Sequence, residues 1–215
     1  MSFGGFRFHF KQPKEDALID KIVRSKNKTP PEHLVRELTA NMRSEMTSSL
    51  VAHAVLRRFE KKLDGLKYAR LLCLFYRVAD ADMSGALLKL FAARQASPMQ
   101  YVPGDVSHNA QILAQHLEKK VTLFKTYGLV VSIENDATPL RTQADFDTTT
   151  GILESFLDIT KNLEGVQYDV QNLDFHIADI LLLEHTIVFY KINFYLIVLL
   201  RFLMQMTAEQ LTVVS

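Results

Sequence analysis

Cysteine is almost absent from this chain, and its scarcity bears on the setting of the protein. The 215 residues contain one cysteine, Cys73, within an apolar helical pattern. A single cysteine provides no disulfide framework of the kind that stabilises secreted domains. The start of the sequence, MSFGGFRFHFKQPKED, also lacks the charged segment and following apolar segment of a secretory signal. Both observations predict a cytoplasmic protein.

Catalytic and metal-binding motifs are lacking as well. The sequence contains no glycine-rich phosphate loop, no nucleophile elbow, no paired-cysteine motif and no His-Glu-x-x-His. His108 and His116 have no carboxylate or cysteine partner at ligand spacing. Asp80 and Asp82 resemble the opening of a calcium loop without its remaining ligands, so a helix end followed by a cap is the favoured interpretation. We therefore expect no enzyme activity, no metal and no cofactor.

Proline and glycine are sparse, at six and eight residues, and they gather where loops are expected. The segments between them have helical periodicity, and the segment 66–79 is apolar nearly all round, which is typical of a central helix. Helices are predicted at 16–24, 32–43, 48–63, 66–79, 84–94, 109–127 and 152–163, with two or three more in the last third. The only candidate strand is Val130 to Ile133. Since no fixed-period repeat is visible, we predict an irregular all-helical stack.

One long apolar run, from Ile177 to Met206, is long enough to raise the question of a membrane span. Several ionisable residues interrupt it, and each charged one costs roughly 2.5 to 3.5 kcal/mol near a bilayer centre. These residues are Asp179, Glu184, His185, Lys191 and Arg201. We therefore predict a pair of buried core helices for this run instead of a span.

Charge is distributed unevenly along the chain, although the net charge is only +1. Residues 1–70 carry fifteen Lys and Arg against eight Asp and Glu, whereas residues 71–215 carry ten against sixteen. A basic first third favours an anionic partner, either a membrane surface or nucleic acid.

The most basic stretch, Lys21 to Leu38, also contains a predicted helix start. Thr29 and Glu32 fit an N-cap and the acidic member of a capping box, with a proline at the first helical position. Four further cations precede this helix start, where phosphate binds readily; they are Lys21, Arg24, Lys26 and Lys28. A solvated run of charge is the alternative interpretation of these side chains.

The order of these segments resembles the ENTH/ANTH superfamily of clathrin adaptors, whose domains begin with a lysine-bearing helix, cross a proline-containing loop and reach a basic, histidine-containing helix start. The stretches HLEKKVTLFKTY and ILLLEHTIVFYKINFYLIVLLRFLMQMTAEQL are similar to later helices of the ANTH branch. The resemblance covers roughly residues 14–215 by order and pattern, without a long identical run. It implies an all-α fold, a right-handed superhelical stack of about eight to ten helices (an α-solenoid), with residues 14–215 as a single domain after an aromatic segment, 1–13.

The same resemblance implies a peripheral membrane adaptor domain that binds phosphoinositide headgroups in clathrin-mediated endocytosis or vesicle trafficking. Arg24 and His33 occupy places of the family's headgroup motif, but Pro30, Pro31 and Glu32 stand where its lysines are expected. Because prolines remove backbone donors and Glu32 adds repulsion, we expect a weakened pocket that is less selective for the headgroup. The implied site is Lys21, Arg24, Lys26, Lys28 and His33, in which Lys26 and Lys28 supply charge from the loop.

The implied location is cytoplasmic, at the plasma membrane or on endosomal coated vesicles. Clathrin or adaptor complexes are expected to bind through a tail beyond Ser215, and no nucleic acid is expected. A different class of function stays open: a non-enzymatic helical scaffold or assembly subunit whose basic face binds an acidic protein or RNA.

The first residues alternate in a period of two, with Phe6, Phe8 and Phe10 set against Arg7 and His9. This spacing favours an extended segment over a helix. Exposed phenylalanines beside a basic region suit insertion at a lipid interface. The alternative is a strand-like tail packed on the surface of the domain.

Overall fold

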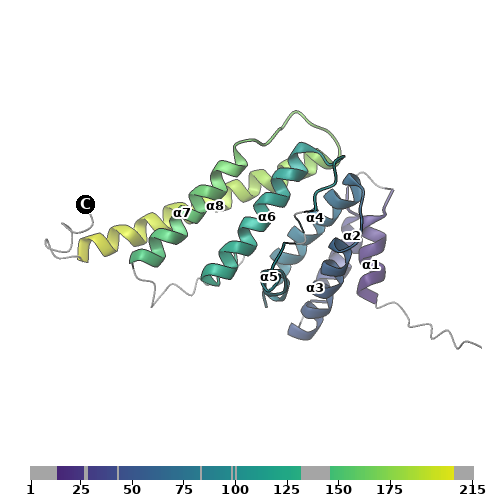
Figure 1. Ribbon diagram of the computed structural model, residues 1–215, viewed down its shortest axis with the longest axis horizontal. Coiled ribbons are helices and arrows are strands. Elements are labelled where there is room, and N and C mark those ends of the chain that lie inside the picture. The colour runs from purple at the N-terminus through teal and green to yellow at the C-terminus, as the bar shows by residue number, and fades with distance from the viewer. Residues whose placement is uncertain are drawn as a thin grey trace, which may run out of the picture.

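A computed structural model describes residues 14–26, 29–42, 44–82, 84–97, 99, 101–131 and 146–205. Within these ranges the chain is an all-α stack of eight helices and contains no strand (Figure 1). The helices are α1 (Lys14–Val23), α2 (Glu32–Ala40), α3 (Glu45–Phe59), α4 (Gly65–Ala81), α5 (Ala86–Ala92), α6 (His108–Tyr127), α7 (Phe146–Leu163) and α8 (Leu173–Gln205). The predicted all-helical stack is thereby confirmed. The aromatic segment 1–13 lies outside the described residues.

Helix α4 is the centre of the stack, as its apolar sequence predicts. It packs against α1, α2, α3, α5, α6 and α8. Its Phe75 meets Phe59 of α3 and Phe91 of α5 edge-on, with ring centroids 6.2 and 4.8 Å apart. Cys73 is completely buried here, and burial raises the pKa of its thiol to about 12. A thiol so protonated and enclosed is a packing element of the core.

The loop after α4 has the structure that its aspartates predict. Asp82 follows the last residue of α4, and its buried carboxylate accepts hydrogen bonds from the hydroxyl of Ser84 at 2.6 Å and from the backbone N–H of Leu87 at 2.8 Å. This carboxylate therefore joins the end of α4 to the first turn of α5. The predicted helix end is confirmed; the N-cap of α5 is Gly85, which has no capping side chain, and Asp82 binds the first turn of α5 from outside it.

Helices α6, α7 and α8 form the other half of the molecule and extend away from the α1–α5 end (Figure 1). Helix α7 packs along α8, where Phe156 stacks on Tyr195 with ring centroids 5.6 Å apart. Beyond this stacked pair, α8 continues for a further ten residues. Every side chain that the structure describes in this last part is exposed or only partly buried.

The prediction for the last third is wrong in two respects. One helix of 33 residues, α8, replaces the two or three expected helices, and much of its length is exposed instead of buried. No proline or glycine follows Gly165, so nothing in the chain forces a break. Asn193 lies inside the helix, and its side-chain amide donates to the carbonyl of Phe189 at 2.9 Å.

Other boundaries move by a few residues. Helix α3 begins three residues earlier than predicted because Ser44 and Thr47 form a capping box. Helix α7 begins at Phe146, six residues before the predicted start. Of the predicted strand, Val130 and Val131 are in a loop, and the remainder lies outside the described residues.

Candidate functional site

Four of the five residues of the predicted headgroup site are described, and all four are exposed. Lys21 is in the last turn of α1, Arg24 and Lys26 follow that helix, and His33 is the second residue of α2. Lys28 lies outside the described residues. Among the residues that the structure describes, none of these four side chains forms an ion pair. We call this set, Lys21, Arg24, Lys26 and His33, the basic surface.

The packing of α1 explains why the cations point outward. Leu18, Ile19, Ile22 and Val23 are buried against the neighbouring helices. Lys21 and Arg24, three residues apart, are therefore held on the opposite side of the same turn. Their position at the carboxyl end of α1 is also the one that the helix dipole favours for cations.

The predicted capping box at the start of α2 is not present. Helix α2 begins at Glu32 with Pro31 as its N-cap, and no side chain caps it. The carbonyl of Pro31 accepts from the N–H groups of Leu34 and Val35 at 3.0 and 3.1 Å. Glu32 is thus the first residue of the helix instead of the third, so its carboxylate is not in the position from which it would reach back to Thr29.

Glu32 is instead held by two arginines. Its Oε1 accepts from Arg36 of the same helix at 3.1 Å and from Arg77 of α4 at 3.0 Å. Burial would raise the pKa of Glu32, but the hydrogen bonds and charges of both arginines bring it below its usual value. The cluster of one carboxylate and two guanidinium groups carries a net charge of +1.

This cluster changes the expected effect of Glu32. The sequence predicts that Glu32 repels an anion, whereas its charge is compensated within the fold. Arg36 and Arg77 therefore extend the basic region beyond the predicted residues. Their role was missed because Arg77 is 45 residues from Glu32; only the i to i+4 spacing of Glu32 and Arg36 is visible in the sequence.

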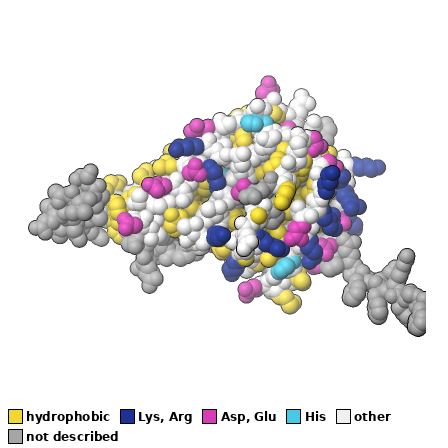
Figure 2. Space-filling view, viewed as in Figure 1, with side chains coloured by type: hydrophobic (Ala, Val, Ile, Leu, Met, Phe, Trp, Pro, Cys, Tyr) yellow, Lys and Arg dark blue, Asp and Glu magenta, His cyan; other side chains and the backbone are white. Residues whose placement is uncertain are grey.

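Figure 2 shows how charged side chains are distributed over one face of the molecule. Lys and Arg side chains are concentrated at the end of the molecule formed by the first helices, where Asp and Glu are interspersed among them. Ion pairs account for part of this mixture, including Lys14 with Glu37 at 3.2 Å and Arg57 with Asp16 at 2.7 Å. The basic surface is one part of this end whose charges the described residues leave uncompensated.

A second unusual surface lies on α8. Its large apolar side chains are exposed on the side opposite the buried positions Val188, Lys191 and Tyr195. We call this set the α8 outer face: Phe189, Tyr190, Phe194, Leu196, Ile197, Leu200 and Met204. By length and composition α8 is also able to cross a membrane, and 22% of its most apolar window is buried. A core helix of a soluble protein is mostly buried, so α8 does not fit the description of a core helix.

Inside the molecule, a polar cluster joins the two halves of the stack. The ring of His116 on α6 donates from Nε2 to Glu184 of α8 at 2.6 Å, and Lys120 donates to both carboxylate oxygens of Glu184 at 3.0 Å. All three residues are buried. The ammonium of Lys120 also lies 5.5 Å from the ring centre of Tyr76 on α4. Because this cluster is closed to solvent, it serves the packing of α4, α6 and α8.

No group of three or more His, Cys, Asp or Glu side chains able to hold a metal ion occurs among the described residues. No protein-family model, no curated protein sequence and no solved structure matches the chain.

Proposed function

We propose that this chain is a peripheral membrane domain that binds phosphoinositide headgroups and acts as an adaptor in clathrin-mediated endocytosis or vesicle trafficking. The contact residues are Lys21, Arg24, Lys26, Lys28 and His33. The observation that carries the proposal is the basic surface: four exposed cationic or titratable side chains without ion-pair partners in the described chain.

The energetics of an anionic bilayer favour this assignment. Each Lys or Arg near such a surface contributes about 1 kcal/mol, so several uncompensated cations together are enough for reversible attachment. Arg36 and Arg77 add a net positive charge after Glu32 is neutralised. Pro30 and Pro31 have no N–H groups to offer a phosphate. The contact is therefore expected to depend on charge more than on the identity of the headgroup.

Co-sedimentation with liposomes tests the proposal. The wild-type chain is expected to bind vesicles that contain phosphatidylinositol bisphosphate or phosphatidylserine, with less than about a tenfold preference at matched charge. The triple variant K21E, R24E and K26E is expected to lose about 3 kcal/mol or more of binding free energy, which is over a hundredfold. Added salt weakens the wild-type contact because it screens exposed charges.

The matched control is Lys161→Glu, which reverses an exposed lysine on α7 without an ion pair in the described chain. It is expected to bind vesicles nearly as well as the wild type. Negligible binding of the wild type to both kinds of vesicle would reject the proposal, and so would equal binding by the triple variant and the wild type.

The α8 outer face favours a second candidate, a helical assembly subunit. A contiguous exposed apolar surface of this kind is unusual on a monomer and marks an interaction site. We test this candidate with Ile197→Glu and Leu200→Glu, two exposed positions on this face. Light scattering coupled to size exclusion is expected to show an oligomer for the wild type and a monomer for the double variant; a wild-type monomer at high concentration excludes self-assembly through this face.

A further inference from the structure

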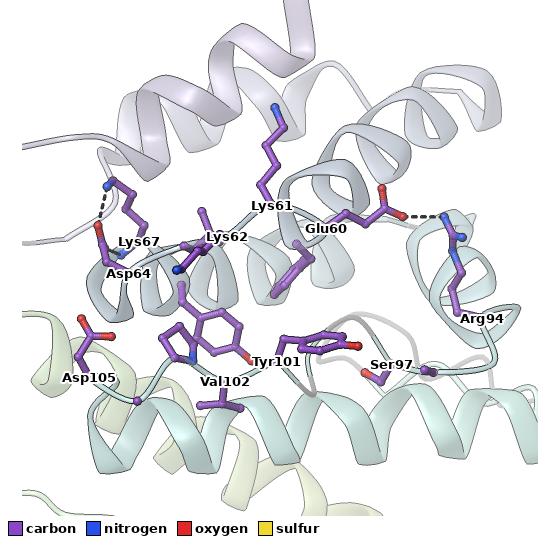
Figure 3. A pocket seen from close by; sticks show the side chains of 16 residues that line it. Glu60, Lys61, Lys62, Asp64, Lys67, Arg94, Ser97, Tyr101, Val102 and Asp105 are labelled. Atoms are coloured by element: carbon purple, nitrogen blue, oxygen red, sulfur yellow. Dashed lines mark hydrogen bonds and ion pairs between the residues drawn. The ribbon is translucent and has the colours of Figure 1, made fainter.

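A groove separate from the basic surface lies between the α3–α4 turn and the chain that leads into α6 (Figure 3). Its volume is about 990 Å³. One wall consists of residues 59–64 with Lys67 and Tyr68, and the other of Arg94, residues 96–97 and residues 101–105. We call it the α3–α4 groove.

The first wall has a surplus of positive charge that the fold does not use. Each carboxylate of the groove has a partner: Glu60 accepts from Arg94 at 3.0 Å, Asp64 pairs with Lys67, and Asp105 accepts from the backbone N–H of Gly65 at 3.0 Å. Figure 3 shows the Glu60–Arg94 and Asp64–Lys67 pairs at the two ends of this wall.

Between these two pairs lie Lys61 and Lys62. Both are exposed, and neither forms an ion pair with any described residue. Glu60 and Asp64 are paired with Arg94 and Lys67, whereas the hydrogen bond to Asp105 leaves its negative charge in place. Two unpaired ammonium groups against one unpaired carboxylate give the groove a net positive charge that is available to an external anion.

The second wall is apolar along Tyr101, Val102 and Pro103, between Arg94 at one end and the exposed Asp105 at the other. Tyr101 is 82% exposed, so most of its ring has no contact within the chain. At the base, Tyr68 is buried and its hydroxyl donates to the carbonyl of Met99 at 2.6 Å, which leaves an apolar ring surface. Aromatic side chains presented in this way are the usual anchors of peptide and protein interfaces.

The two walls are held together at the start of α4. Gly65 lies so close to the other wall that a Cβ there would be 2.5 Å from the carbonyl oxygen of Asp105. The hydrogen bond from Gly65 to the Asp105 carboxylate fixes the same junction. A groove built on such a contact is preformed, which lowers the entropic cost of binding.

We propose that the α3–α4 groove binds an extended peptide segment of a partner protein in which acidic and apolar side chains alternate. Successive side chains of an extended chain point to opposite sides. Carboxylates on one side then meet Lys62, while apolar side chains on the other side pack against Tyr101 and Val102. Lys61 extends away from Tyr101 (Figure 3) and adds positive charge at the outer edge of the same turn. This charge complementarity identifies the occupant as an acidic peptide. The inference goes beyond membrane binding and does not depend on it.

The test uses fluorescence anisotropy with a labelled octapeptide of alternating glutamate and leucine, without lipid. Two companion peptides replace every glutamate by glutamine or every leucine by serine, and each is expected to bind about tenfold more weakly or worse. The variant K61E with K62E and the variant Tyr101→Ser are each expected to lose a similar factor. All three substituted side chains are exposed, so folding is retained.

Lys161→Glu on α7 is the matched control and is expected to bind as the wild type does. Amide chemical shifts are expected to move at Tyr101 and Val102 on titration with the peptide. Equal binding of either companion peptide, or unchanged binding by the groove variants, overturns the proposal. A wild-type dimer that Tyr101→Ser converts to a monomer also overturns it, because the groove then belongs to self-association.

Discussion

At the scale of single residues, Gly65 shows how a missing side chain permits a contact between distant segments. Gly65 begins α4, and the backbone of Asp105, 40 residues further along, approaches it closely. Any side chain at this position has to displace backbone atoms instead of a flexible group, which is costly in a packed interior. Nothing in the local sequence marks this contact, because the LDGL stretch around Gly65 is equally consistent with an ordinary turn.

We expect Gly65→Ala to lower the free energy of unfolding by about 1 to 3 kcal/mol, the usual cost of overpacking. Urea denaturation measures the change through the midpoint of the transition. Gly104→Ala is the matched control, since a Cβ at Gly104 meets no atom within 4 Å. Equal stability of the two variants contradicts the close approach.

The buried cluster on α6 and α8 makes a prediction about pH. Burial lowers the pKa of His116 below its usual value of 6.5, so the fold favours the neutral ring. Burial would raise the pKa of Glu184, but Lys120 and His116 bring it down to about 2 from 4.5. For both groups the pKa is higher in the unfolded chain than in the folded chain, so the unfolded chain binds the proton at higher pH. Stability is therefore present at neutral pH, and it falls below about pH 6.5 through His116 and below about pH 4.5 through Glu184.

The expected result is a free energy of unfolding that decreases from pH 7 to pH 5 more steeply for the wild type than for His116→Asn. Denaturant titrations at several pH values measure both slopes. Identical slopes would show that folding does not lower the pKa of His116.

The residues of this cluster also show why a site is harder to predict than a helix. Lys120 follows the buried Leu113 and Leu117 by seven and three residues, so helical spacing places it on the apolar side of α6. Its charge is tolerated there because Glu184, 64 residues away, compensates it. The exposure of Lys21 and Arg24, by contrast, follows from local spacing alone. Local patterns predict which face of a helix is apolar; they do not reveal the partner that allows a charge to enter the core.

At the scale of elements, the helices with a continuous apolar stripe and clear boundaries are predicted best. Helices α4 and α6 occur within two residues of their expected bounds. The start of α2 is placed correctly, although its expected cap is wrong, because the two prolines end the preceding loop whichever side chain follows. Helix α8 is predicted worst. Its buried stripe and its exposed apolar side chains are both hydrophobic, so composition alone gives no sign that half of its surface faces outward.

The continuity of α8 is tested at Asn193, an exposed position inside it. Asn193→Pro is expected to lower the free energy of unfolding by about 3 kcal/mol, since proline removes a backbone hydrogen bond and clashes with the preceding turn. Asn193→Ala is the matched control and is expected to stabilise the helix by roughly half a kcal/mol. If Asn193 were in a turn between two helices, proline would cause little loss in the same urea titration.

At the scale of the whole molecule, the uneven charge of the sequence reappears as a difference between the two ends of the stack. The first helices carry the basic surface, and α8 ends at the opposite end with its outer face (Figures 1 and 2). The stack itself follows from sequence, because proline and glycine mark most of its loops. The arrangement of the two surfaces does not, since it depends on how α7 and α8 extend from the core.

If the chain binds lipid as proposed, the separation of these two ends limits its orientation on a bilayer. Helix α8 alone spans about 50 Å. The basic surface and the α8 outer face therefore contact one bilayer together only when the long axis of the molecule lies parallel to it. Upright attachment through α1 and α2 instead lifts the tip of α8 clear of the headgroups. In that orientation the apolar end of α8 is exposed to the solvent and accessible to a protein partner.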